Sequence, residues 1–142
     1  MNAPIEVYKN VVEELIPFNQ TLGFKLVEVK QDFASILIPF RPDMIGNPVK
    51  RSIHGGVIAA AMDTVGGVAG MTSFTSFEDT LATIDLRIDY LRYGQEKDII
   101  CEAYIIKSGS KVIFTRMTAH HKDEPDIPIA EGRGVYSVRR KK

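Results

Sequence analysis

One segment of the chain, residues 52 to 71, consists mostly of apolar residues and glycine, yet it carries a carboxylate, Asp63, near its middle. A helix that is apolar on all sides is normally buried, so this pattern predicts a central helix over residues 54 to 71. A buried charge without a partner is strongly unfavourable, and such groups are usually paired or functional. Asp63 is therefore the first candidate for a functional residue.

The composition limits the class of protein. A chain of 142 residues fits a single domain, expected over residues 1 to 142, and buries roughly 70% of its unfolded surface without a disulfide or metal. Its 18 basic and 18 acidic residues balance, which removes the simplest argument for binding nucleic acid. The single cysteine, Cys101, excludes an internal disulfide and is interpreted as strand packing. The basic tail, residues 139 to 142, is interpreted as a solvated terminus.

The first ten residues contain Glu6 and Lys9 and no apolar run typical of a secretory signal, so we expect a cytoplasmic protein. Residues 53 to 71 are the candidate membrane span, but a charge at the bilayer centre would cost about 3 kcal/mol or more. We therefore expect a core helix there and no membrane association. His120 and His121 lack a third ligand nearby, so we expect no metal site.

The remaining chain predicts one further helix and a set of strands. Helical spacing of apolar residues predicts an N-terminal helix within residues 1 to 17, ended by Pro17. Two-residue alternation and turn signals predict strands over residues 24–30, 33–40, 81–91, 98–106, 111–119 and 127–138. In the 81–91 strand, strict alternation assigns Ala82 and Ile84 to the apolar face and Thr83 and Asp85 to the polar face.

The order of these elements predicts an α+β fold. An antiparallel sheet with one apolar face needs a cover, and the 54–71 helix is the one apolar element long enough to supply it. We therefore expect an antiparallel sheet wrapped around a long central helix. The loop over residues 41 to 53 precedes that helix and is long enough to have a functional role.

Four motifs occur in the order expected for a known family. They are Asn47 in the loop, the turn His54-Gly55-Gly56, the pair Asp63-Thr64 within the helix, and Thr83-Ile-Asp85 in the following strand. Together they resemble the hotdog fold of the PaaI-like acyl-CoA thioesterases. That family usually has the loop Asn six residues before the His and a Gly three before it. Here Asn47 is seven residues before, and position 51 is Arg.

The resemblance implies hydrolysis of an acyl-CoA without a metal or redox cofactor, in dimers that often pair again into tetramers. The helix itself also predicts a dimer. Nine helical residues advance about 13 Å and rotate about 900°, so His54 and Asp63 lie half a turn out of phase. One chain therefore cannot complete the site. If two helices ran antiparallel across a two-fold axis, the His-Gly-Gly turn of one copy would approach Asp63 of the other.

Thioester hydrolysis needs a polarised carbonyl and an activated water or a nucleophile. The N–H of Gly55 at the helix N-terminus is the candidate donor to the thioester oxygen, because such N–H groups lack an intrahelical partner. Asp63 is expected to act as the general base or as a nucleophile. The resemblance implies that Thr83 positions water and that His54 and Asn47 complete the catalytic set. For His54, a role as helix cap that orients the loop is favoured over a direct catalytic one.

Further residues are candidates for holding the substrate. Gly56 and Thr64 adjoin the catalytic groups, and cations beside turns are expected to meet the phosphates of coenzyme A. The candidates for that role are Arg92, Lys107, Ser108, Gly109 and Lys111. An apolar tunnel between subunits, lined by Met71, Phe74, Phe77 and Ile53, would hold the acyl group. Gly66 and Gly67 are interpreted as sites of close packing without chemistry.

Two other functions stay open at this point. A non-catalytic hotdog protein would bind acyl-CoA as a sensor or scaffold, and the acid retained in the helix argues against it. A hotdog dehydratase or hydratase would need a catalytic His near an acidic group on the same face of the substrate. The motifs favour the thioesterase, with Asp63 and the Gly55 amide as its central groups.

Overall fold

The computed structural model describes residues 3 to 142. Its elements, in chain order, are α1 (Ile5–Asn10), a π-helical turn (Val11–Leu15), α2 (Pro17–Leu22), β1 (Lys25–Lys30), β2 (Phe33–Ile38), a 3-10 turn (Pro42–Met44), β3 (Ile45–Asn47), β4 (Ser52–Ile53), α3 (Gly55–Met71), β5 (Thr80–Tyr90), β6 (Ile99–Ser108), β7 (Val112–His121) and β8 (Pro128–Arg139). The predicted order of hairpin, long helix and four strands is confirmed. The short pair β3 and β4 is an addition inside the 41–53 loop.

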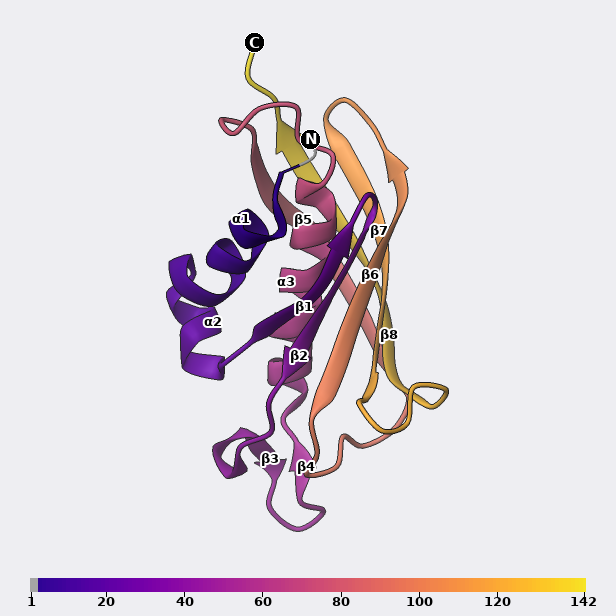
Figure 1. Ribbon diagram of the computed structural model, residues 1–142. Helices are drawn as coiled ribbons and strands as arrows, with labels where there is room; N and C mark the ends of the chain where they lie inside the picture. Colours follow the sequence, from indigo (N-terminus) through magenta and orange to yellow (C-terminus); the bar gives the residue numbers. More distant parts are fainter. Residues whose placement is uncertain (1–2) are drawn as a thin grey trace.

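The main sheet has six antiparallel strands in the order β1-β2-β6-β7-β8-β5. Helix α3 lies in the hollow of the curved sheet, and α1 and α2 lie beside it (Figure 1). The inward side chains of β2, β6, β7 and β8 form the core with one face of α3. The expected fold, an antiparallel sheet wrapped around the 54–71 helix, is confirmed.

Helix α3 begins immediately after His54, whose ring nitrogen Nδ1 accepts a hydrogen bond from the N–H of Gly56 at 2.8 Å. This bond satisfies one of the orphan donors at the helix N-terminus. Most of the helix is buried against the sheet, but one stripe stays half-buried: Ala60, Asp63, Thr64, Gly67 and Met71. Its spacing of three or four residues makes it a continuous face. That face borders a cavity described below.

The N-terminal helical run ends before Pro17, as predicted, because Ile16 has extended backbone angles. A second helix that was not predicted, α2, begins at Pro17 itself. Proline is well suited to that position because its fixed φ is helical and its missing N–H would have had no partner. Residues 1 and 2 of the predicted helix lie outside the described residues.

The alternation predicted for β5 is wrong at its centre. The pairing with β8 shifts register between Thr83 and Asp85, so Ile84 forms a bulge and is 57% exposed. A bulge inserts one residue and reverses which side chains face inward beyond it. Thr83 therefore faces α3, while Asp85 after the bulge lies on the outer face with the charged residues of the strand.

Three further expectations concern the basic tail, a membrane span and Cys101. The basic tail is not wholly solvated, because Arg140 binds the carbonyl oxygens of Ser73 and Gly109. Over residues 3 to 142, none of the helices combines the length and the apolar character needed to span a membrane. Cys101 is buried in β6, and burial raises the pKa of its thiol above the usual range.

Candidate active site

Asp63 is held by two hydroxyl groups from the sheet. The Thr83 hydroxyl donates to Oδ1 of Asp63 at 2.7 Å. The Tyr136 hydroxyl, from β8, donates to the backbone oxygen of Asp63 at 2.9 Å and lies 3.4 Å from Oδ1. Among residues 3 to 142, no donor binds the other carboxylate oxygen, Oδ2. The carboxylate is thus oriented through one oxygen and keeps the second available to accept a proton.

Tyr136 reaches Asp63 because Gly66 and Gly134, which have no side chains, leave room for its ring. A Cβ atom on Gly66 would lie 2.2 Å from the Tyr136 hydroxyl oxygen, and one on Gly134 would lie 2.8 Å from its ring. Tyr136 is 1% exposed, and burial together with the charge of Asp63 raises the pKa of its phenol above the usual range. The phenol therefore stays protonated and acts as a donor. The packing role expected for Gly66 is confirmed, against the sheet.

A cavity of about 610 Å³ opens beside Asp63. Its walls come from the half-buried stripe of α3, the start of β5, the loop after α3 and the N-terminal helices. The polar residues of the wall include Thr64, next to Asp63 in the sequence, whose hydroxyl lies 3.3 Å from the Oδ1 of Asn19 and donates to it. The apolar part is formed by Val11, Ile16, Phe18, Val68, Met71, Phe74 and Leu81. The cavity is therefore suited to an apolar chain that ends in a polar group near Asp63.

The N-terminus of α3 borders a separate cavity of about 480 Å³. His54 caps the N–H of Gly56, whereas the N–H of Gly55 has no acceptor among residues 3 to 142, since the first N–H groups of a helix lack an intrahelical partner. The carbonyl of Gly55 accepts a hydrogen bond from the Tyr90 hydroxyl at 2.7 Å. This fixes the first turn of α3 against β5. Other residues lining the cavity are Gly46, Asn47, Ser52, Ile53, Ile58, Arg92, Tyr93 and Gly94.

The loop before α3 keeps an unusual backbone conformation at position 51. Arg51 has a φ of 55°, in the left-handed region that favours glycine. This is the position at which the PaaI-like pattern has Gly, so the sequence departs from the pattern while the backbone adopts a conformation suited to it. The Arg51 side chain forms an ion pair with Glu96. Asn47 binds the N–H groups of Val49 and Lys50 through its side-chain oxygen at 3.0 Å each, and so stabilises the turn.

The predicted catalytic residues are therefore divided between two cavities of one chain. Asp63, Thr64 and Thr83 line one, and the loop and helix-start residues line the other. Arg92 lies with the second group and donates to the carbonyl of Pro128. The 107–111 turn lines neither cavity and lies at the end of the molecule away from β3 and β4 (Figure 1). Roles for Lys107, Ser108, Gly109 and Lys111 stay predictions.

The predicted tunnel residues are divided in the same way. Met71 and Phe74 line the Asp63 cavity, and Ile53 lines the Gly55 cavity. Phe77 is 72% exposed and lines neither. Over residues 3 to 142, no group of three His, Cys, Asp or Glu side chains is close enough together to hold a metal ion.

Sequence reasoning missed Tyr136, Tyr90 and the N-terminal helices as parts of these cavities. Tyr136 is 73 residues from Asp63, and no local pattern connects the two. One signal was present: Gly66 lies inside a helix, where glycine is unfavourable, and so indicates a close approach by another group. The aromatic partner itself cannot be named without the register of β8.

The family was identified by comparison with known proteins. A model of the family described as "Thioesterase superfamily" matches residues 51–127. The chain belongs to the thioesterase superfamily. The medium/long-chain acyl-CoA thioesterase YigI of Escherichia coli is 31% identical to it over 135 residues, which cover 87% of this chain and 86% of the relative. The expectation of an enzyme that hydrolyses thioesters is confirmed.

Solved structures from this superfamily share the fold. A protein from Shewanella oneidensis, described as related to the thioesterase superfamily, is 32% identical with a TM-score of 0.80, and the match covers 94% of this chain and 95% of that one. A thioesterase from Haemophilus influenzae has a TM-score of 0.85 over 99% of this chain and 93% of that chain. It is only 18% identical, so it shows the fold alone. The expected hotdog fold is confirmed.

Proposed function

We propose that the protein hydrolyses acyl-CoA thioesters to the free acid and coenzyme A, with Asp63 as the catalytic carboxylate. The observation that carries this proposal is the Thr83 hydroxyl bound to one oxygen of Asp63, at the wall of a mainly apolar cavity. The likeness to a medium/long-chain acyl-CoA thioesterase supports the choice of substrate. An apolar acyl chain fits the 610 Å³ cavity, in which Met71 and Phe74 lie beyond Asp63.

In the proposed reaction, the N–H of Gly55 donates a hydrogen bond to the thioester oxygen. This donor stabilises the negative charge that develops there as the carbonyl is attacked, an effect typically worth about 3 kcal/mol. Asp63 accepts through Oδ2 the proton of the water that attacks the carbonyl carbon. The carbon–sulfur bond then breaks and coenzyme A leaves as the thiolate. Attack by Asp63 itself, giving an anhydride that water hydrolyses, is the alternative within the same site.

The two catalytic groups would come from different copies of the chain. Gly55 and Asp63 are eight residues apart on one helix, about 12 Å along its axis, and they border separate cavities. β5 is an edge strand of 11 residues, and such an edge is a ready template for pairing with another chain. Pairing of two β5 strands about a two-fold axis would bring each Gly55 toward the other copy's Asp63. Further pairing of dimers into tetramers stays a prediction.

Coenzyme A would bind along the cavity at the start of α3. Arg92 supplies a positive charge in its wall, and Asn47 and Gly56 contribute polar groups near Gly55. Within a two-fold dimer, the 107–111 turn of the other copy is a further source of positive charge for the phosphates. Lys107 and Lys111 are the side chains that would provide it.

The proposal is tested by thiol release from acyl-CoAs of graded length. We expect Asp63→Asn to lower kcat by about 100-fold or more, the usual scale for loss of a general base. Asp85→Asn, a matched change on the outer face of β5, should leave kcat within about twofold, because surface substitutions away from a site have small effects. An Asp63→Asn variant with the wild-type rate would exclude this carboxylate from the mechanism.

The shared site is tested with hybrid dimers. Asp63→Asn chains and Gly55→Pro chains carry different affinity tags and are co-expressed, and the doubly tagged hybrid is purified. Each homodimer should be nearly inactive. A composite site predicts that the hybrid retains one intact site of two, so it should show about half of the wild-type rate. A hybrid as inactive as the two homodimers would contradict sites shared between copies.

A further inference from the structure

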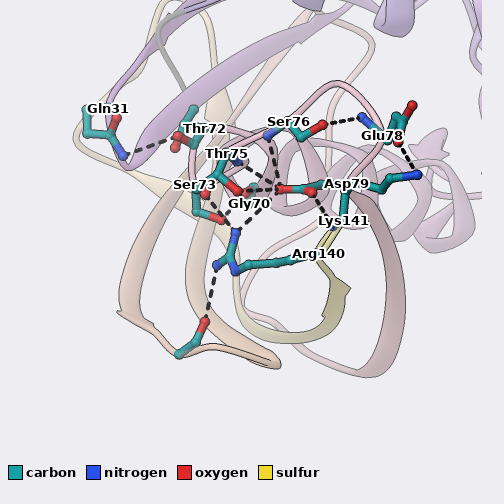
Figure 2. A network of polar contacts seen from close by, with 11 residues as sticks. Gln31, Gly70, Thr72, Ser73, Thr75, Ser76, Glu78, Asp79, Arg140 and Lys141 are labelled. Carbon is teal, nitrogen blue, oxygen red and sulfur yellow. Dashed lines mark hydrogen bonds and ion pairs between the residues drawn. The ribbon is translucent and has the colours of Figure 1, made fainter.

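The C-terminal tail binds the loop that follows α3. Past the end of β8, the Arg140 guanidinium donates to the carbonyl oxygen of Ser73 at 2.9 Å and to that of Gly109 at 3.3 Å. The backbone N–H of Lys141 donates to Oδ1 of Asp79 at 2.8 Å. Figure 2 shows Arg140 extended beneath the loop, with Asp79 at the centre of the contacts. The tail is therefore part of the folded structure at this end of the molecule.

Asp79 organises the loop from inside. Its side chain is fully buried, and its Oδ2 accepts hydrogen bonds from the N–H of Thr75 at 2.8 Å and from that of Ser76 at 3.3 Å. The Arg140 guanidinium lies 3.7 Å from the same oxygen. The backbone hydrogen bond from Lys141, together with those from the loop, holds the pKa of Asp79 below its usual range. A buried charged group requires such partners, so the loop conformation depends on the tail.

The same loop lines the Asp63 cavity beyond the end of α3. Phe74, 8% exposed, and Asp79 both line the cavity, together with Met71 at the end of α3. Met71 lies eight residues after Asp63, which corresponds to about 12 Å along the helix. An acyl chain that starts at Asp63 and follows α3 would therefore meet the loop and Phe74 with its far end.

We propose that the tail residues Arg140 and Lys141, through Asp79, determine how long an acyl chain the enzyme accepts. They are positioning residues, because they act by holding Phe74 and its loop across the end of the cavity. The inference rests on the proposed function and adds a determinant of chain-length specificity at the opposite end of the cavity from Asp63. Loss of the tail contacts should release the loop and lengthen the cavity.

The experiment compares kcat/KM for hexanoyl-, decanoyl- and myristoyl-CoA. Arg140→Met and a chain that ends at Arg139 should raise the myristoyl-to-hexanoyl ratio by about fourfold or more, the effect of burying one further methylene. Lys142→Met is the matched control, since it removes a positive charge from an exposed residue of the same tail. It should leave the ratio unchanged. Phe74→Ala opens the end of the cavity directly and should shift the ratio in the same direction.

Two outcomes separate this inference from the proposed function. If wild type releases no thiol from any acyl-CoA, the proposed function fails. If wild type is active and Phe74→Ala shifts the ratio while Arg140→Met and the shortened chain do not, the role of the tail is overturned. The affinity of the three acyl-CoAs for Asp63→Asn proteins, with and without the tail change, gives a readout that needs no hydrolysis. An unchanged myristoyl-to-hexanoyl ratio of affinities there would also overturn the inference.

Discussion

The two cavities along α3 differ in what each lacks. The cavity at the helix start has a backbone donor, the Gly55 N–H, but its lining residues include no carboxylate. The cavity at the middle of the helix has the Asp63 carboxylate and a mainly apolar wall, but Gly55 does not line it. Each contains one half of the chemistry that thioester hydrolysis needs. Under the proposed function, a single chain would be inactive because its donor and its carboxylate line different cavities.

The largest effect is expected at the helix start. Gly55→Pro removes the N–H at a position where proline fits, because Gly55 is the first residue of α3 and His54 before it has extended backbone angles (φ −57°, ψ 127°). We expect kcat to fall by about 100- to 1000-fold, as for loss of one oxyanion donor. Gly55→Ala is the control, since it keeps the N–H and crowds Tyr90 in a similar way. Equal losses in both variants would assign the effect to crowding.

A smaller effect is expected from the hydroxyl that orients Asp63. Thr83→Val removes the donor to Oδ1 and keeps the shape of the side chain. A hydrogen bond to a charged group contributes roughly 1.5–3 kcal/mol, so kcat should fall by about tenfold or more. Thr80→Val, in the same strand and cavity, should have much less effect. Thiol-release rates at saturating acyl-CoA measure the difference. Similar losses for both variants would show that Thr83 has no special relation to Asp63.

Substitutions at the adjacent glycines Gly66 and Gly67, which lie on different faces of α3, should have opposite effects on stability. A Cβ on Gly66 would lie 2.2 Å from the Tyr136 oxygen, whereas one on Gly67 would meet nothing closer than 3.7 Å. Gly66→Ala should lower the free energy of unfolding by about 1–3 kcal/mol through overpacking. Gly67→Ala should raise it by up to about 1 kcal/mol, because alanine favours the helix. Urea unfolding monitored by circular dichroism tests both. A stable Gly66→Ala protein would mean that Tyr136 readily moves away.

The smallest effect is expected from pH at Asp79, in the loop that lines the Asp63 cavity. Hydrogen bonds hold the pKa of Asp79 below its usual range in the folded state, so this group stabilises the fold fully above the unfolded value, about 3.9. That contribution is lost as the pH falls through the lower, folded value. We expect the free energy of unfolding of wild type to fall more steeply below about pH 4 than that of Asp79→Asn. Urea unfolding at graded pH measures the two slopes, and equal slopes would contradict this linkage.

Much of the fold could be predicted from local patterns. The central helix was expected at residues 54–71 and is found at Gly55–Met71, with His54 as its cap. The strands were placed because two-residue alternation and turn residues are short-range signals. The face of Thr83 was predicted incorrectly because one extra residue in a strand leaves no local signal but reverses the side-chain directions beyond it. Pro17 ends the first helix as predicted, but the second helix that begins at Pro17 was missed because proline is also well suited to the first position of a helix.

The candidate site also has one part that local sequence patterns predict and one part that they do not. By itself the sequence determined that a buried helix carries a carboxylate, and that this carboxylate lies half a turn out of phase with the helix start, because both follow from spacing within one helix. Only the tertiary structure decided which groups meet Asp63. Thr83 and Tyr136 arrive from strands 20 and 73 residues further on, and their contacts depend on the register of the whole sheet. Local periodicity carries no information about that register, so the environment of the carboxylate emerges only when the sheet closes around α3.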